Sequence, residues 1–215
     1  NRPAGRYCAG QMPSATSNAE KTRRRILDTA FEEFYRNGFQ GGSINRIVAD
    51  AEITKGALFH HFKGKNELGY QVIDELIRPK VESCWIEPLS EAIDPIEDIK
   101  ALLQQHRPEN REDLCRGCPL NNLAQEMSPL DEGFRQRINS IYDDWRKAFA
   151  QALKRGIKSG KVRTDIDPTQ TATFIIASMA GIIGTAKSAQ SVELLQIAAG
   201  GLYQYLDSLS PTAAP

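Results

Sequence analysis

SINRIVADAEITKGALFHHFKGKNEL, residues 43–68, is the stretch around which the rest of the chain is organised. It predicts two short helices joined by a tight turn and followed by the start of a third. Ser43 is a suitable N-cap for the first helix, because its hydroxyl can accept a hydrogen bond from an amide of the first turn. The apolar residues that follow have helical spacing and are expected to bury one face: Ile44, Ile47, Val48 and Ala51.

The second of these helices has an unusual outward face. After a turn at Glu52 and Ile53, Thr54 is the predicted N-cap, and Leu58 and Phe62, four positions apart, are predicted to pack inward. The outward positions carry a cation, two imidazoles, an aromatic ring and two small residues: Lys55, Gly56, Ala57, Phe59, His60 and His61. Such a face suits a recognition helix that comes close to a nucleic-acid groove, with phosphate contacts at its flanks.

Residues 54–68, TKGALFHHFKGKNEL, resemble the helix-turn-helix signature of TetR-family transcriptional regulators, in which a Y/F-x-H-F element precedes a lysine that opens the fourth helix. The likeness continues back through KTRRRILDTAFEEFYRNGFQGGSINRIVADAEI, residues 21–53. Phe59 is a departure, because many members carry tyrosine there and its phenolic hydrogen bond to phosphate is missing here. The resemblance implies an all-α fold, with a three-helix DNA-binding domain followed by a helical domain for ligand binding and dimerisation.

The resemblance also implies which residues contact DNA. It assigns reading of the groove to Thr54, Lys55, Gly56, Ala57, Phe59 and His60, phosphate contacts to His61 and Lys65, and a cap facing the backbone to Ser43. From the residues alone, Lys55 is the long cation of the outward face and is the expected guanine reader. His61 has an alternative role, which is to pack on the first helix.

We expect three parts: a flexible arm at 1–16, a helix-turn-helix domain at 17–64, and an effector-binding and dimerisation domain at 65–210. The arm either reaches DNA or is a solvated tail. Ser17-Asn18-Ala19-Glu20 is a capping box that opens the first helix, and Gly38 is the αL residue expected to end it. The basic run Lys21–Arg25 either lies near phosphate or is a solvated first turn. Cations at a helix N-terminus oppose the helix dipole, and a nearby phosphate would offset that cost.

The charge distribution fits this division. The whole chain carries 27 basic and 27 acidic residues, so its total charge does not indicate a nucleic-acid binder. Residues 1–66, however, hold 11 basic and six acidic residues, which leaves this part at +5 and residues 67–215 at −5. A basic head on an acidic body that phosphate repels is the expected arrangement for a DNA-binding protein. The first 20 residues lack the apolar core of a signal peptide, so we expect a cytoplasmic, reduced protein.

Beyond residue 64 the apolar spacing predicts further helices. One opens near Lys65 and meets Pro79, which should bend or break it because proline lacks an amide proton and clashes with the preceding turn. The remaining expected elements are a short helix at 95–106, a polar loop at 107–117, a short helix at 119–127, and a long helix from Phe134 that ends at Gly160.

The last two helices, about 168–189 and 191–209, are expected to form a homodimer interface. The first is apolar nearly all round and rich in small residues, and such a helix must be buried on every side. One domain of this size can hardly cover both, so we predict a four-helix bundle across a two-fold axis. The alternative is a wholly intramolecular core. No membrane span is expected, because the longest apolar run, 174–183, is shorter than the about 20 residues that cross a bilayer.

A small-molecule pocket is predicted in the second domain. Apolar walls with a few polar groups are typical of such cavities, although ordinary core packing accounts for the same residues. The candidate lining residues are Trp85, His106, Cys118, Asn121, Asn122, Phe134, Tyr142, Trp145 and Phe149.

Cys115-Arg116-Gly117-Cys118 has several interpretations. A lone C-x-x-C supplies two of the four ligands of structural zinc, and His106 or Cys84 would have to complete the set. Thioredoxin-like chemistry requires a βαβ context that is absent. A thiol sensor at Cys118 is possible, because a cysteine near a helix N-terminus can have a lowered pKa. Packing at the start of a helix is the simplest interpretation.

Together these features predict a ligand-responsive repressor that binds an inverted repeat of double-stranded DNA as a homodimer and is released by a small-molecule effector. No catalytic residue, cofactor or metal site is predicted. The alternatives are an electrophile-responsive regulator acting through Cys118, a DNA-binding activator or architectural protein without effector, and, from another class, a dithiol redox enzyme.

Overall fold

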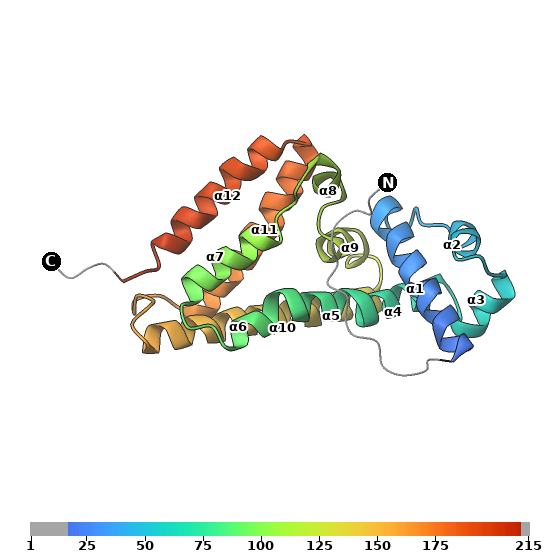
Figure 1. Ribbon diagram of the computed structural model, residues 1–215, viewed down its shortest axis with the longest axis horizontal. Coiled ribbons are helices and arrows are strands. Elements are labelled where there is room, and N and C mark those ends of the chain that lie inside the picture. Colours follow the sequence, from blue (N-terminus) through green and yellow to red (C-terminus); the bar gives the residue numbers. More distant parts are fainter. Residues whose placement is uncertain (1–16, 212–215) are drawn as a thin grey trace.

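The computed structural model describes residues 17–211, which fold into helices without any strand. The predicted arm at 1–16 lies outside these residues. The elements are α1 Asn18–Asn37, α2 Ile44–Asp50, α3 Lys55–His61, α4 Lys65–Val72, η1 Ile73–Ile77, α5 Arg78–Val81, η2 Glu82–Ile86, α6 Glu87–Ser90, α7 Pro95–Gln105, α8 Arg111–Arg116, α9 Pro119–Met127, α10 Glu132–Lys158, α11 Pro168–Ala189 and α12 Val192–Asp207. We call residues 17–64, with α1–α3, the head and residues 65–211 the body (Figure 1).

The head begins and turns where the sequence predicts. Ser17 accepts from the amide of Glu20, and the Glu20 carboxylate accepts from the amide of Ser17, so the capping box is confirmed. Glu52 has φ of 50°, which makes the tight turn between α2 and α3. Gly38 ends α1 with a positive φ of 73°, which favours glycine, but its ψ of 165° lies outside the αL region, so the prediction of an αL conformation is wrong.

Pro79, which the sequence analysis predicted to bend or break the helix that leaves the head, does not break it. α4, η1, α5, η2 and α6 form one continuous rod along α10 (Figure 1). The π-helical turn Ile73–Ile77 ends directly before Arg78, whose amide bonds to the carbonyl of Ile73, five residues back. This wider turn makes room for the proline ring, which would otherwise meet the carbonyl of the preceding turn. The second π turn, Glu82–Ile86, stands in the same relation to Pro88.

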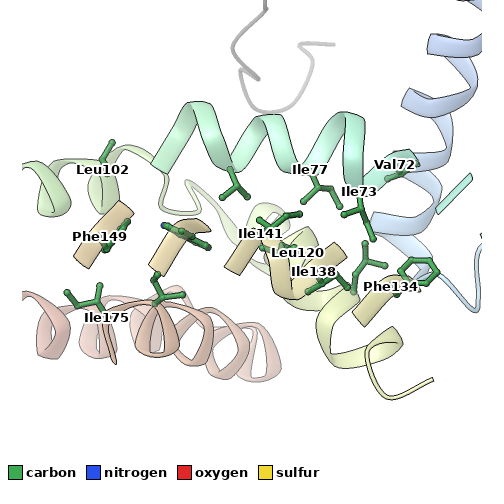
Figure 2. Packing of buried hydrophobic residues seen from close by; sticks show 14 of the residues in the cluster. Val72, Ile73, Ile77, Leu102, Leu120, Phe134, Ile138, Ile141, Phe149 and Ile175 are labelled. Carbon is green, nitrogen blue, oxygen red and sulfur yellow. The ribbon is translucent and has the colours of Figure 1, made fainter. Parts of the chain in front are cut away.

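The body core forms around α10. Isoleucine and aromatic side chains of α10 pack against apolar side chains of the rod on one side and of α11 on the other (Figure 2). Phe134 and Phe149 are fully buried, and Leu120 of α9 fills the same layer. The stretch 107–117, predicted as a polar loop, contains the short helix α8, which Asn110 caps by accepting from the amide of Asp113.

α11 and α12 lie side by side, and α11 also packs on α8 (Figure 1). Ala172, Ile175 and Ile176 bury one side of α11 in the core, but Phe174 and Ile197 remain 51% and 66% exposed. Over the described residues, α11 is the one helix long and apolar enough to cross a membrane, with mean hydropathy 1.3. The run 174–183, from which no membrane span was predicted, is only part of this helix, and a core helix of a soluble protein can have the same length and composition.

Candidate nucleic-acid interface

α3 presents the outward face predicted from the sequence. Thr54 caps the helix, its hydroxyl accepting from the amide of Ala57 at 3.1 Å. Leu58 and Phe62 are 0% and 1% exposed, so they fix the rotation of the helix against the head core. The opposite side is open to solvent at Lys55, Gly56, Phe59 and His60, whereas Ala57 and His61 are half-buried.

The ring of His61 lies 6.3 Å from that of Phe62 and 5.4 Å from that of His60, measured between centroids. His61 is therefore at the edge of the exposed face, between solvent and the packed side of α3. Phe59, with 49% of its surface exposed, is a large apolar side chain left open on a helix of seven residues. An exposed aromatic ring beside a lysine is consistent with an interaction surface.

A buried carboxylate that the sequence analysis missed holds α2 against α1. Glu33, 5% exposed, accepts from the amide of Ser43 at 2.8 Å, from Arg46 Nε at 2.7 Å and from Asn37 Nδ2 at 2.8 Å. Burial raises the pKa of this carboxyl, but the hydrogen bonds and the charge of Arg46 outweigh that effect and leave the pKa below its usual value. Ser43 thus caps α2 while its own amide is held by α1.

Lys65 does not point freely to where an anion would sit. Its ammonium donates to the carbonyl of Gln40 at 3.1 Å and lies 4.9 Å from the centre of the Phe39 ring. Burial lowers the pKa of Lys65, while the charges of Glu126 and Glu33 act in the opposite direction. At the N-terminus of α4, Gly64 provides no side-chain cap, and Glu67 accepts from the amide of Lys63 at 2.7 Å.

The basic run Lys21–Arg25 is divided between structural and exposed roles. Arg23 forms an ion pair with Glu75 of η1, and its guanidinium lies 5.3 Å from the Phe62 ring centre. Arg24 pairs with Asp28 one turn later at 2.9 Å, and both are exposed. Lys21 and Arg25 are exposed as well. Arg23 therefore connects α1 to the rod, and the other three basic side chains remain at the surface of the head.

Five of the predicted pocket residues form one aromatic chain in the body. Trp85 lies 5.0 Å from His106 and 5.3 Å from Trp145, and Trp145 lies 6.2 Å from both Tyr142 and Phe149. The indole nitrogen of Trp145 is buried and has no hydrogen-bond partner among residues 17–211. Burial, with the nearby charge of Lys80, lowers the pKa of His106, and burial raises the pKa of Tyr142, so both side chains are neutral near pH 7.

The other predicted pocket residues lie elsewhere or have other partners. Phe134 packs on Phe39 and Tyr70, at the junction of head and body, with ring centres 4.6 Å and 5.0 Å away. Asn122 donates to the carbonyl of Arg116 at 2.8 Å. Asn121 is half-buried next to it on α9. The pocket prediction grouped these residues by residue type. Residue type alone does not show which helices pack against each other.

The thiol of Cys118 does not have the lowered pKa that the sensor interpretation requires. Cys118 is the N-cap of α9. Burial raises its pKa, and the amides of Asn121 and Leu120 with the charge of Lys187 offset only part of that effect. Cys84, Cys115 and Cys118 are all free thiols. Within residues 17–211 no three His, Cys, Asp or Glu side chains come together as a metal site would require.

Comparison with known proteins identifies the chain. Residues 26–69, which include α2, α3 and most of α1, match the family described as bacterial regulatory proteins, tetR family. Residues 95–201 match the tetracyclin repressor-like C-terminal domain. The chain belongs to the TetR family. Members of this family are soluble transcriptional regulators that bind DNA as dimers, not enzymes, which excludes the dithiol redox enzyme.

Individual TetR-family proteins resemble the chain over most of its length. The HTH-type transcriptional repressor DhaR of Mycobacterium sp. (strain GP1) is 28% identical over 168 residues, which are 75% of this chain and 80% of that protein. Among solved structures, E. coli NemR in its reduced form is 23% identical with a TM-score of 0.76, covering 91% of this chain and all of that one. A TetR-family regulator from Cytophaga hutchinsonii has a TM-score of 0.80 at 19% identity, over 93% and 100% of the two chains.

Proposed function

We propose that the protein is a ligand-responsive repressor that binds an inverted-repeat operator as a homodimer. The observation that supports DNA binding most directly is α3, whose packed side is closed by Leu58 and Phe62 while Lys55 and Gly56 face outward. A lysine next to a residue without side chain can approach a base edge closely, and guanine offers two acceptors in the major groove. The family membership and the repressor DhaR among its relatives are consistent with this function.

We propose the following DNA contacts. Lys55 reads a base, Gly56 and Ala57 allow close approach, and Thr54, Phe59 and His60 line the rest of the groove face. Ser43 and His61 lie at the flanks, where phosphates pass. Lys65 contacts phosphate through an ammonium proton other than the one donated to Gln40. A regulator with these contacts acts where bacterial DNA is, so we expect it in the cytoplasm.

We propose that the homodimer forms through α11 and α12. Between them lies a hollow of about 380 Å³, lined by Phe174, Gly181, Ile182, Ala198, Gly201 and Tyr205. A side-chain Cβ added at Gly181, Gly184, Gly200 or Gly201 would meet no atom within 4 Å, so these glycines face open space in the single chain. Glycines combined with exposed Phe174 and Ile197 suit close packing of a second copy across a two-fold axis.

We propose that the effector binds among the aromatic residues that extend from His106 to Phe149. Neutral aromatic side chains favour a largely apolar, uncharged ligand, and the indole N–H of Trp145 would donate to an acceptor atom of that ligand. The effector must bind the DNA-free arrangement more tightly, because equal affinity for both arrangements shifts neither.

Selection from random duplexes tests this function. The wild-type protein should enrich an inverted repeat, and Lys55→Ala should relax the preference at one symmetrical pair of positions, a loss of about 1–3 kcal/mol of discrimination. Lys147→Ala is the matched control, because it removes an exposed lysine from α10 in the body. An unchanged consensus with Lys55→Ala would refute the assignment of Lys55, and no enriched sequence at all would refute DNA reading by α3.

A further inference from the structure

α9 lies between the head and the rest of the body (Figure 1). Its apolar side, Leu120, Leu123 and Met127, is buried mainly against α10, and Leu123 also lies beside Phe34 of α1. Its polar side and the turn before it carry side chains that contact α1 and the loop after α1. These contacts join residues more than 80 positions apart. They attach the head to this part of the body in addition to the covalent passage into α4, the Arg23–Glu75 ion pair and the packing of Phe39 on Phe134.

The first contact is at Glu126, near the C-terminal end of α9. Its carboxylate accepts from the amides of Phe39 at 2.8 Å and Gln40 at 2.7 Å. A side chain at Gly38 would place its Cβ 3.0 Å from Glu126 Oε2, and Gly38 has φ of 73°, so the loop has the residue that this approach requires. Lys65 holds the same loop from α4 through the carbonyl of Gln40.

The second contact is at the turn that precedes α9. The guanidinium of Arg116 donates to Glu32 of α1 at 2.6 Å and lies 4.2 Å from the ring centre of Tyr35. The Tyr35 hydroxyl donates to the carbonyl of Gly117. Two residues on one face of α1 therefore hold two consecutive residues of this turn, with one charge-assisted and one neutral hydrogen bond.

The same turn is attached to α11. Lys187 of α11 donates to the carbonyl of Arg116 at 3.2 Å and to Asn122 Oδ1 at 3.1 Å. Asn122 in turn donates to the carbonyl of Arg116 at 2.8 Å. An unbroken series of polar contacts thus runs from α1 through Arg116 to α11, one of the two helices of the proposed dimer interface.

We infer that α9 and the end of α8 set the position of each head relative to the dimer interface, with Glu126 of α9 and the pair of Arg116 on α8 with Glu32 as the positioning contacts. The inference rests on the proposed function and adds the element that controls it. Two heads bound to successive half-sites must lie about one helical turn of DNA apart, roughly 34 Å. Two heads held at that separation bind both half-sites at once, which raises the affinity for the palindrome. Heads that move freely lose part of this increase, although each keeps its own contacts with a half-site.

Three variants with the same loss of one negative charge test the inference in the full-length protein. Glu126→Gln and Glu32→Gln weaken the two contacts, and Glu132→Gln is the control, because its carboxylate bonds only to Arg135 and Gln136 of its own helix in the described structure. Affinity is measured by fluorescence anisotropy for the selected palindrome and for a duplex with a single half-site. Circular dichroism and gel filtration check that each variant is folded and has the wild-type assembly state.

Glu126→Gln and Glu32→Gln should lower palindrome affinity about tenfold relative to half-site affinity, whereas Glu132→Gln should leave the ratio unchanged. An unchanged ratio in the first two variants would overturn the inference. Equal losses on both duplexes would overturn it as well, because they indicate a role in the groove contacts themselves.

Hydrogen exchange, which needs no DNA, separates this inference from the proposed function. Glu126→Gln should accelerate exchange at the amides of Phe39 and Gln40, and Glu132→Gln should not. A wild-type protein that binds neither duplex refutes the proposed function alone. Unchanged exchange at both amides in Glu126→Gln refutes the positioning contact, whatever the DNA results.

Discussion

Glu33→Gln is the substitution that should reveal most about how the recognition helix is held. The wild-type carboxylate accepts three hydrogen bonds from Ser43, Arg46 and Asn37 while only 5% exposed. Glutamine has nearly the same shape but a single acceptor oxygen, and its NH₂ group would face one of these donors. The variant therefore removes the charge and places the NH₂ group opposite one of the three donors, with no change in packing volume.

The expected loss follows from the number and exposure of the partners. A hydrogen bond to a charged group contributes about 1.5–3 kcal/mol, and an unpaired buried group costs about 1–3 kcal/mol. The Arg46 side chain is 54% exposed, so water can hydrogen-bond to its guanidinium when the carboxylate is lost. The total loss of stability is therefore expected toward the lower end of these ranges. We expect destabilisation of about 2–3 kcal/mol, which for a chain of this size lowers Tm by roughly 4–12 °C.

Thermal unfolding followed by circular dichroism, at fixed protein concentration, measures this loss, with the exposed Glu91→Gln as control. The pH dependence gives a second test. Because the pKa of Glu33 is lowered on folding, its contribution is present above its unfolded value of 4.5 and is lost as pH falls through the folded pKa. The difference between wild type and variant should be full at pH 7 and shrink below about pH 4.5. A difference below 1 kcal/mol at pH 7, or one that grows in acid, would refute the reasoning.

Other substitutions test other parts of the structure. Ile197→Glu should convert the dimer to a folded monomer in sedimentation velocity, because Ile197 is 66% exposed on α12. Ile93→Glu is the control and should remain dimeric, because Ile93 is 82% exposed in the loop between α6 and α7, outside α11 and α12. A dimeric Ile197→Glu would exclude α12 from the interface. Cys118 should react with iodoacetamide at pH 7 more slowly than free cysteine, because burial raises its pKa and lowers its thiolate fraction; faster reaction would restore the sensor interpretation. Gly69→Ala should cost about 1–3 kcal/mol in urea unfolding, because its Cβ would lie 2.6 Å from both Phe134 Cζ and Phe39 Cε2; a neutral result would mean that both rings can move.

Local signals in the sequence predicted much of the fold. The capping box at Ser17 and the caps at Ser43 and Thr54 each depend on residues within a few positions, and each is present in the structure. The outward face of α3 was likewise readable, since Leu58 and Phe62 define the packed side by spacing alone. The helix does not break at Pro79, because a π turn accommodates the proline ring. No simple residue pattern marks that turn in the sequence.

The polar contacts that position the head were not predictable from sequence patterns. Glu33 looks like any charged residue of an amphipathic helix, and its burial depends on Arg46 arriving from α2. Glu126 and Arg116 meet α1 and its loop across more than 80 residues of chain, so no local spacing connects them. Phe134 was grouped with the pocket because it is aromatic, whereas its partners are Phe39 and Tyr70.

The most direct test of the central claim is the stoichiometry and salt dependence of binding to the selected palindrome. Titration by fluorescence anisotropy between about 50 and 200 mM salt gives both quantities. We predict two chains per duplex and a log–log slope of about −0.9 for each phosphate neutralised, from basic residues carried by both heads. One chain per palindrome, or an affinity that does not change with salt, would contradict dimeric recognition of DNA through α3.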